Sequence, residues 1–309
     1  MDNRKRVITL AAMSAAAYVI IQARPYAVAA KTKIEGRANE CSWTQTLDLP
    51  SSLATFTEAK IANEKAIRVI GRDDSLGLLQ IATTGRTFWI AARGETLDGP
   101  HLLAYLMAEQ RWMASGSGGH HVKKGDIVVD VGAHVGTFTD LALAQGAAKV
   151  IQIEPDPVNV VALRRNFAKE MADGRVVLIA EGAWSSTSTL DLHIGDDNSG
   201  MGSMVIKEQG KKVVRVPVRP LDEQLKEIGI TKVDFIKMDI EGAEREALKG
   251  AAATIHASKP TLMLESYHLP DDVVVLPQVI KGIRADYQVT TGPCETLPER
   301  IIPHVNFFY

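Results

Sequence analysis

The sequence predicts an α/β protein built on a mostly parallel, doubly wound sheet. Short apolar runs without strict alternation recur in the C-terminal two thirds of the chain, as expected for strands covered on both faces. Helical patterns fall between these runs, and this rhythm places ligand sites beyond the carboxyl ends of the strands. The predicted strands are 127–131, 150–153, 176–180, 233–238 and 261–265.

The composition is that of an ordinary folded enzyme. Of the 309 residues, 46% are hydrophobic and 23% are charged, and the formal net charge is -2. No basic surplus is available to hold a phosphate backbone, so a nucleic-acid partner is not expected. Cys41 and Cys294 match no metal or redox spacing, so both thiols are expected to be reduced and no disulfide is predicted.

Residues 1–36 are predicted to form a hydrophobic leader. The basic triplet Arg4-Lys5-Arg6 precedes residues 7–21, which carry no charge, and Ala27-Val28-Ala29 resembles a signal-peptidase site. Three interpretations stay open: a membrane anchor, a cleaved signal peptide, or a packed Ala-rich helix.

Residues 37–122 are predicted to form a small accessory segment of strands and a helix. Apolar stretches separated by turn residues predict a strand meander, and a helix follows at 101–113. The glycine-rich residues 116–119 and the turn that follows mark the boundary to the main domain, residues 123–309. The predicted strands of the meander are 67–70, 78–82 and 88–91.

Two regions interrupt the rhythm of the main domain. Residues 189–194 and 213–218 alternate as an antiparallel ribbon would, and the loop 195–203 between them is expected to close over a substrate. The late strands 287–290 and 305–309 have no helix pattern between them, and they predict an antiparallel edge of the sheet.

A glycine turn, Asp130-Val131-Gly132-Ala133-His134-Val135-Gly136, follows the first strand of the main domain. Gly132 and Gly136 permit a tight strand-to-helix turn at which backbone can approach a ligand. The third glycine of a dinucleotide fingerprint is missing. S-adenosylmethionine has no phosphate and presents an ammonium that Asp130 can meet, so the turn favours this cofactor. The alternative is a structural turn capped by Asp130.

Further candidates for the cofactor site follow the next two strands. Glu154 lies 22 residues after Gly132, about where an acidic side chain of a nucleoside-binding α/β fold takes both ribose hydroxyls. Glu181 and Ala183 follow the third strand and are expected to border the adenine. Ala133 and His134 lie within the turn itself and are also cofactor candidates.

The segment Lys237-Met238-Asp239-Ile240-Glu241-Gly242-Ala243-Glu244 is unusually rich in ionisable groups for a strand end. Such groups are costly to bury unless they meet a ligand or one another. Asp239 lies at the mouth of the strand, and a functional role is expected for it. For Glu241, a functional role and a structural i,i+4 pairing with Arg245 are both open.

Taken together, these segments resemble the FkbM-type methyltransferase family. The resemblance rests on the glycine turn, on Pro217-Val218-Arg219-Pro220-Leu221-Asp222, on the acidic element 237–244 and on 262–265, and it covers roughly residues 123–309. It implies a Rossmann-like class I methyltransferase fold, S-adenosylmethionine as methyl donor, and O-methylation of hydroxyls on sugars, glycans, lipids or natural products. It further implies that the cofactor is held by Asp130, Gly132, Gly136 and Glu154, and that Asp239 and Glu241 lie near the reaction centre. Asp239 is also a candidate for the cofactor site.

A hydroxyl acceptor must lose a proton during methyl transfer, so a base or a metal is required. The candidates for the base are Asp239 and His268, which follows the fifth strand. Asp239 and Glu241 could instead hold a cation, but two carboxylates do not make a metal site, so no metal is expected.

Two other functional classes stay open. One is an NAD(P)-dependent oxidoreductase, which the missing third glycine and the absence of a Tyr-x-x-x-Lys pair disfavour. The other is a membrane-anchored protein that binds S-adenosylmethionine without catalysis. Since this cofactor is a cytoplasmic metabolite, the main domain is expected to face the cytoplasm, with export after signal cleavage as the alternative.

Overall fold

A mixed sheet forms the centre of the fold. Its strands are β4 (Ile127–Val131), β5 (Lys149–Ile153), β6 (Val176–Ile179), β10 (Phe235–Met238), β11 (Thr261–Glu265), β12 (Val289–Thr291) and β15 (Val305–Phe308). The computed structural model describes residues 26–27, 30–31, 34, 41–92, 99–195, 200, 202–207, 212–296 and 300–309. The strand order is β12-β15-β11-β10-β4-β5-β6. β15 pairs antiparallel with both β11 and β12, whereas the other neighbouring strands pair in parallel, so the predicted parallel sheet with an antiparallel edge is confirmed.

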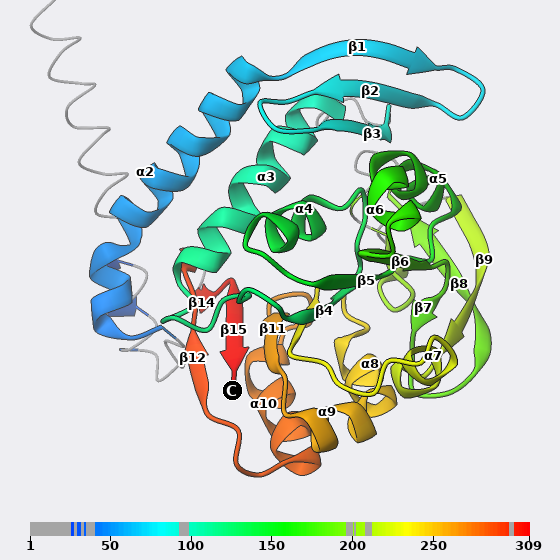
Figure 1. Cartoon of the computed structure of the whole chain (residues 1–309). Coiled ribbons are helices and arrows are strands. Elements are labelled where there is room, and N and C mark those ends of the chain that lie inside the picture. Colours follow the sequence, from blue (N-terminus) through cyan, green and yellow to red (C-terminus); the bar gives the residue numbers. More distant parts are fainter. Residues whose placement is uncertain are drawn as a thin grey trace, which may run out of the picture.

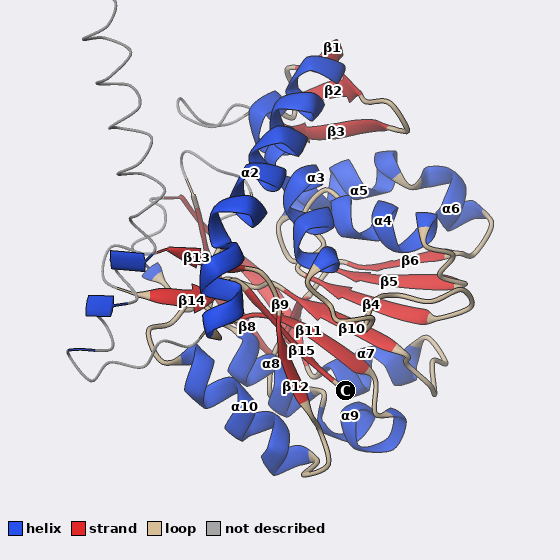
Figure 2. Ribbon diagram, turned by 90° about the vertical axis from the view of Figure 1, so that its left-hand side faces the viewer, coloured by secondary structure: helices blue, strands red, loops and turns tan. Residues whose placement is uncertain are grey.

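Helices cover both faces of this sheet, as Figure 2 shows. One layer contains α3 (Gly99–Ser115), α4 (Thr137–Ala144), α5 (Pro157–Asn166) and α6 (Ala168–Ala172). The other contains α7 (Leu221–Glu227), α8 (Glu244–Gly250), α9 (Ala252–Ser258) and α10 (Asp272–Ile283). The start of α5 follows the sequence prediction, because Asp156 caps the helix and Pro157 occupies its first turn.

Alternate strand residues enter two separate hydrophobic clusters. Val129 and Ile236 pack on the side of α7 to α10, whereas Val128 and Phe235 pack with Phe138 on the side of α3 to α6. Successive side chains of a strand point to opposite faces, so both faces of each strand must be apolar. This explains why the strands read in the sequence as short, mainly apolar runs without strict alternation.

The accessory segment contributes α3 to the α3 to α6 layer, and its other elements pack on the outer side of that layer (Figure 1). It contains α2 (Trp43–Ala66), the antiparallel strands β1 (Arg68–Asp73), β2 (Leu78–Ala82) and β3 (Thr87–Ala91), and α3. The predicted meander and helix are therefore present. Arg86, in the turn between β2 and β3, pairs with Asp140 of α4 at 2.8 Å and with Glu170 of α6 at 2.6 Å. These ion pairs fix the accessory segment to the main domain.

A disulfide joins Cys41 to Cys294, with an S–S distance of 2.00 Å. The prediction of two reduced thiols is therefore wrong. The two cysteines are 253 residues apart in the chain, so spacing gave no indication of their pairing. They meet because the start of α2 packs against the hairpin of β13 (Cys294–Thr296) and β14 (Ile301–Pro303), where Gln45 also donates hydrogen bonds to the carbonyls of Thr291 and Gly292.

The predicted ribbon is also present. β8 (Ser188–Ile194) pairs antiparallel with β9 (Lys212–Arg219), which pairs in parallel with the short strand β7 (Gly182–Ala183). Of the predicted loop 195–203, residues 196–199 and 201 lie outside the described residues. Within the ranges that are described, no helix is long and apolar enough to span a bilayer, and the leader run 7–21 lies outside them.

Candidate active site

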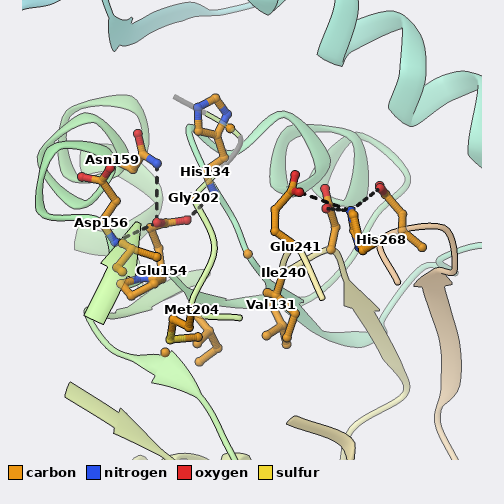
Figure 3. Close-up of a pocket in the computed structure, with 18 of the residues that line it drawn as sticks. Val131, His134, Glu154, Asp156, Asn159, Gly202, Met204, Ile240, Glu241 and His268 are labelled. Atoms are coloured by element: carbon orange, nitrogen blue, oxygen red, sulfur yellow. Dashed lines mark hydrogen bonds and ion pairs between the residues drawn. The ribbon is translucent and has the colours of Figure 1, made fainter. Parts of the chain in front are cut away.

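A cavity of about 490 Å³ opens at the carboxyl ends of β4, β5 and β10 (Figure 3). Its volume lies within the roughly 300–1,000 Å³ of small-molecule sites. Tyr105 and Glu109 of α3 form part of its wall, and Gly202 and Met204 from the connection between β8 and β9 form another part. The cavity therefore occupies the strand ends at which the α/β rhythm predicts a ligand.

The glycine turn is shaped by the protein's own packing. Gly132 has φ 78°, and a Cβ there would lie 1.9 Å from the carbonyl oxygen of Asp239. Gly136 has φ 90°, and a Cβ there would lie 2.1 Å from the ring of Phe167. Both glycines are thus required by close contacts between neighbouring elements. Of the two, Gly132 lines the cavity, whereas Gly136 precedes α4 behind the turn.

Asp130 lies beneath the turn and is not a cavity-lining residue. Its carboxylate is fully buried, accepts a hydrogen bond from Thr139 Oγ1 at 2.7 Å, and lies 3.6 Å from Lys237 Nζ. Burial raises the pKa of Asp130 more than Lys237 and Thr139 lower it. The structure therefore does not bring Asp130 to the place where it would meet an ammonium group of a ligand.

Lys237 is a site residue that the sequence reasoning missed. Its Nζ donates to the carbonyl of Gly132 at 3.0 Å and lies 3.4 Å from Asp239 Oδ2. Burial lowers the pKa of Lys237, but the carboxylates of Asp239 and Asp130 outweigh it and raise that pKa above its usual value. The sequence held a signal for this role, which was a lysine inside a strand that is otherwise apolar. Burial of an unpaired charge costs free energy, so such a lysine is expected to meet carboxylates.

Glu154 borders the cavity at the end of β5. Its Oε2 accepts from the backbone N–H of His134 at 2.7 Å, and its Oε1 accepts from the N–H of Asp156 at 2.9 Å. Burial and the nearby Asp156 raise the pKa of Glu154 to about 8, against the opposing effect of these N–H donors. The carboxyl group is thus held rigidly at the cavity wall.

The other predicted cofactor residues divide into two groups. His134, with φ 50°, and Ala183 line the cavity. Ala133 is buried in the core under the turn. Glu181 lies away from the cavity wall, where Arg219 Nε donates to its carboxylate at 2.6 Å and Gln224 donates at 3.2 Å.

The three predicted catalytic residues lie together at the other side of the cavity. His268 Nε2 lies 3.7 Å from Asp239 Oδ1 and 3.7 Å from Glu241 Oε2. Burial lowers the pKa of His268, but Glu244, Glu241 and Asp239 outweigh it and raise the pKa well above its usual value. Burial raises the pKa of Asp239, and here the opposing effect of Lys237 and His268 prevails and lowers it.

Glu241 is held in a strained backbone conformation. Its φ is 53°, in the left-handed region that side chains other than glycine rarely adopt, and its carbonyl accepts from Ser203 Oγ at 2.6 Å. Arg245, the expected i,i+4 partner of Glu241, pairs with Asp271 and Asp272. Strained residues that persist often lie at functional sites, which agrees with the position of Glu241 on the cavity wall.

Glu265, Glu109 and Tyr267 extend this cluster, and the sequence reasoning did not assign them to the site. Glu265 ends β11, with its Oε2 3.8 Å from His268 Nε2. Burial and the neighbouring Asp239 raise the pKa of Glu265 well above its usual value. The signal for Glu265 was its position at a strand end, whereas Glu109 comes from α3 and only tertiary packing brings it here.

The cavity wall carries a strongly acidic set of side chains. Among its described lining residues, six are acidic and none is a lysine or an arginine. The acidic residues are Glu109, Glu154, Asp156, Asp239, Glu241 and Glu265. Such a wall attracts cationic ligands and repels phosphate groups.

Comparisons with known proteins give a consistent family relationship. A family model described as the methyltransferase FkbM domain matches residues 130–288. The chain is 29% identical over 153 residues to methyltransferase sdnD of Sordaria araneosa, which covers 40% of this chain and 59% of that protein. It is 27% identical over 161 residues to the 31-O-demethyl-FK506 methyltransferase FkbM of Streptomyces tacrolimicus, which covers 43% of this chain and 62% of that protein.

The match thus spans about three fifths of the length of these curated relatives. Among solved structures, methyltransferase FkbM from Methylobacillus flagellatus KT is 21% identical to this chain, with a TM-score of 0.47. That comparison covers 86% of this chain and 62% of the other.

Proposed function

The chain belongs to the FkbM methyltransferase family, and from this premise we propose that it transfers a methyl group from S-adenosylmethionine to a hydroxyl of a small organic acceptor. The observation that carries the proposal is the charge of the cavity. A wall with six acidic side chains and no lysine or arginine among its described lining residues suits a cofactor with a sulfonium and an ammonium. It is a poor match for the pyrophosphate of a dinucleotide, which helix N-termini and basic groups bind.

The cavity residues fit S-adenosylmethionine in two further respects. Glu154 is fixed at the end of β5, where its carboxyl oxygens are positioned to accept the ribose hydroxyls. His134 and Ala183 line the wall beside it and would border the nucleoside. Asp130 acts on this site indirectly in our proposal, because with Lys237 it supports the backbone of Gly132 from beneath.

The acidic cluster at the other side of the cavity is the proposed reaction centre. When bound, S-adenosylmethionine supplies an electrophilic methyl group. Asp239 and His268 position the acceptor hydroxyl, and the carboxylate of Glu241 receives its proton. Glu241 suits this role better than His268, whose Nε2 is fully buried and whose pKa the surrounding carboxylates raise. A bond forms between the acceptor oxygen and the methyl carbon while the carbon–sulfur bond breaks.

Sugars, glycans, lipids and natural products are the acceptor classes that we propose. The name of the Streptomyces tacrolimicus relative assigns its methyl transfer to an oxygen, which supports a hydroxyl acceptor here. The cavity also has apolar walls at Leu106, Met204 and Ile206, which would contact the carbon skeleton of such a molecule.

Binding and turnover measured separately test this proposal. Calorimetry should detect S-adenosylmethionine and not NAD(H). In Glu154→Gln the affinity should fall about 10-fold, since the amide replaces one of the two acceptor oxygens and an unmade hydrogen bond costs roughly 1–3 kcal/mol. Transfer of a labelled methyl group to a panel of hydroxyl acceptors should fall about 10²- to 10⁴-fold in Glu241→Gln, with cofactor affinity unchanged.

The exposed Glu223 provides the control, because Glu223→Gln changes the same functional group away from the cavity. It should alter neither binding nor turnover. Binding of NAD(H) in place of S-adenosylmethionine would favour the oxidoreductase. Binding of S-adenosylmethionine without transfer to any acceptor would favour a protein that binds the cofactor without catalysis.

We propose the cytoplasm as the location of the main domain, because its methyl donor is a cytoplasmic metabolite. The Cys41–Cys294 disulfide is the observation that favours the alternative, export, since disulfides persist mainly in oxidising compartments. A pair of C-terminal reporters tests the assignment. Activity of the reporter that works only outside the cytoplasm would overturn the assignment.

A further inference from the structure

Asp239, Glu265 and His268 bring three potential metal ligands to one point of the cavity wall. One ligand atom from each residue lies within 4.8 Å of the other two. His268 Nε2 is 3.7 Å from Asp239 Oδ1 and 3.8 Å from Glu265 Oε2. Around an ion with bonds of roughly 2.1 Å, tetrahedral ligands lie roughly 3.4 Å apart, so the two distances from His268 Nε2 require only a small contraction.

The orientation of His268 provides a second, independent observation. Its side chain is 2% exposed, and its Nδ1 lies 3.0 Å from the buried Glu244 Oε1, which requires the proton on Nδ1. Its Nε2 is buried and aimed at the two carboxylates, with no hydrogen-bond partner among the described residues. A histidine whose far nitrogen donates to a carboxylate while its near nitrogen faces a cluster of oxygens has the arrangement typical of metal ligands.

The carboxylate of Glu265 also has a buried atom without a hydrogen-bond partner among the described residues. This atom is Oε1, and the side chain is 3% exposed. Three carboxylates, those of Asp239, Glu241 and Glu265, surround one imidazole. Lys237 compensates the charge of Asp239 from beneath, but it lies on the far side of that carboxylate from the cavity.

We propose that Asp239, Glu265 and His268 bind a divalent first-row transition-metal ion, with Glu244 as the group that orients the imidazole. One nitrogen and two carboxylate ligands suit Mn²⁺ or Zn²⁺ better than Ca²⁺ or Mg²⁺. The ion takes the place of a proton on Nε2, because metal ligands bind in their deprotonated form. The sequence offered only Asp239 and Glu241 as ligands, and on that basis no metal was expected.

This assignment rests on the proposed methyl transfer for its role in catalysis. Open coordination positions of the ion would face the cavity, where they would draw in the acceptor hydroxyl and lower its pKa. The hydroxyl proton then passes to Glu241, which is not among the three ligands. The ion would thus account for how Asp239 and His268 position the acceptor.

Binding of the metal alone tests the site without cofactor or acceptor. The full chain is stripped with a chelator and titrated with Mn²⁺, and free Mn²⁺ is followed by its electron paramagnetic resonance signal. Wild type should bind one ion, and Glu265→Gln and His268→Ala should bind at least 10-fold more weakly. Glu244→Gln should weaken binding by about 10- to 100-fold, as expected for a residue that orients a ligand.

His101→Ala is the matched control, because His101 also contacts a glutamate but is 57% exposed and is not among the residues that line the cavity. It should bind Mn²⁺ as wild type does. Calorimetry with S-adenosylmethionine checks that each variant keeps a folded cavity. Absence of one-to-one binding in wild type, or equal binding in Glu265→Gln and wild type, would overturn the site.

Activity after chelation separates the site from the proposed function. Methyl transfer should be lost when the metal is removed and should return on addition of Mn²⁺. Full transfer by the metal-free enzyme would overturn the role of the ion while supporting the methyltransferase assignment. Metal binding to the three residues in a protein that transfers no methyl group would support the site and count against the proposed function.

Discussion

Lys237 Nζ lies 3.6 Å from Asp130 Oδ1, and both side chains are buried between the sheet and α4. The two residues are register partners on the adjacent parallel strands β10 and β4. The same ammonium reaches Asp239 and the carbonyl of Gly132. A single cation therefore links the glycine turn to the acidic strand end, the two elements that define the cavity.

Removal of this cation should destabilise the fold. Lys237→Met removes the cation that Asp130 and Asp239 share, and it should lower the free energy of unfolding by about 3–5 kcal/mol. Denaturant titration of the purified protein measures the change. The double variant Lys237→Met/Asp130→Asn should recover part of the loss, because it also removes one of the two buried negative charges. A single variant as stable as wild type would contradict the role of Lys237.

The close contact at Gly132 predicts a second effect on stability. Gly132→Ala places a Cβ 1.9 Å from the carbonyl oxygen of Asp239, so the ends of β4 and β10 must separate. Gly174→Ala is a matched control, because Gly174 has the same φ of 78° and nothing within 4 Å of an added Cβ. The control should lose only the roughly 1–2 kcal/mol of left-handed strain, whereas Gly132→Ala should lose clearly more. Equal losses in urea titrations would show that the contact is unimportant.

Glu154 predicts a dependence of stability on pH. Burial raises the pKa of Glu154 from its ordinary value of 4.5 to about 8, so the folded state binds its proton more tightly than the unfolded state does. The contribution to stability is therefore fully present below pH 4.5 and is lost as pH rises to about 8, by up to about 1.4 kcal/mol per pH unit. The neutral variant Glu154→Gln should lack this contribution. Parallel pH profiles of wild type and variant would rule out the shifted pKa.

The disulfide predicts sensitivity to reduction. Replacement of Cys41 and Cys294 by serine should lower the free energy of unfolding by about 2–5 kcal/mol, since the bond closes a very long loop. Thermal unfolding with and without a phosphine reductant measures the effect. The reductant should lower the midpoint of wild type and leave the double serine variant unchanged. An unchanged midpoint in wild type would mean that the bond contributes little.

Much of the fold was predictable because its strands are buried on both faces. The predicted bounds of the first and fifth strands of the main domain coincide with β4 and β11, since short apolar runs mark strands that helices cover on both faces. α2 was not predicted. It contains Pro50, and most of its residues are exposed or half-exposed, so no apolar stripe marked it.

The site was predictable only where it follows from strand ends. The sequence places Asp239 and His268 after neighbouring parallel strands, and the structure brings their side chains together because the ends of such strands meet. Asp130 was expected to contact the ligand. Successive side chains of a strand point to opposite faces of the sheet, and the side chain of Asp130 is buried beneath the turn. Glu109 reaches the cavity wall only because of the way α3 packs against the main domain, and a local sequence pattern does not predict such packing.

The pairing of Cys41 with Cys294 also changes the connectivity of the molecule. Together with the backbone between them, the two residues close a covalent ring that contains every strand of the central sheet except β15, and both sides of the cavity. A single cleavage of the backbone within this ring opens the ring, but the disulfide still joins the two resulting fragments. A nicked molecule would therefore keep all its parts attached, and its fragments would separate on a gel only after reduction.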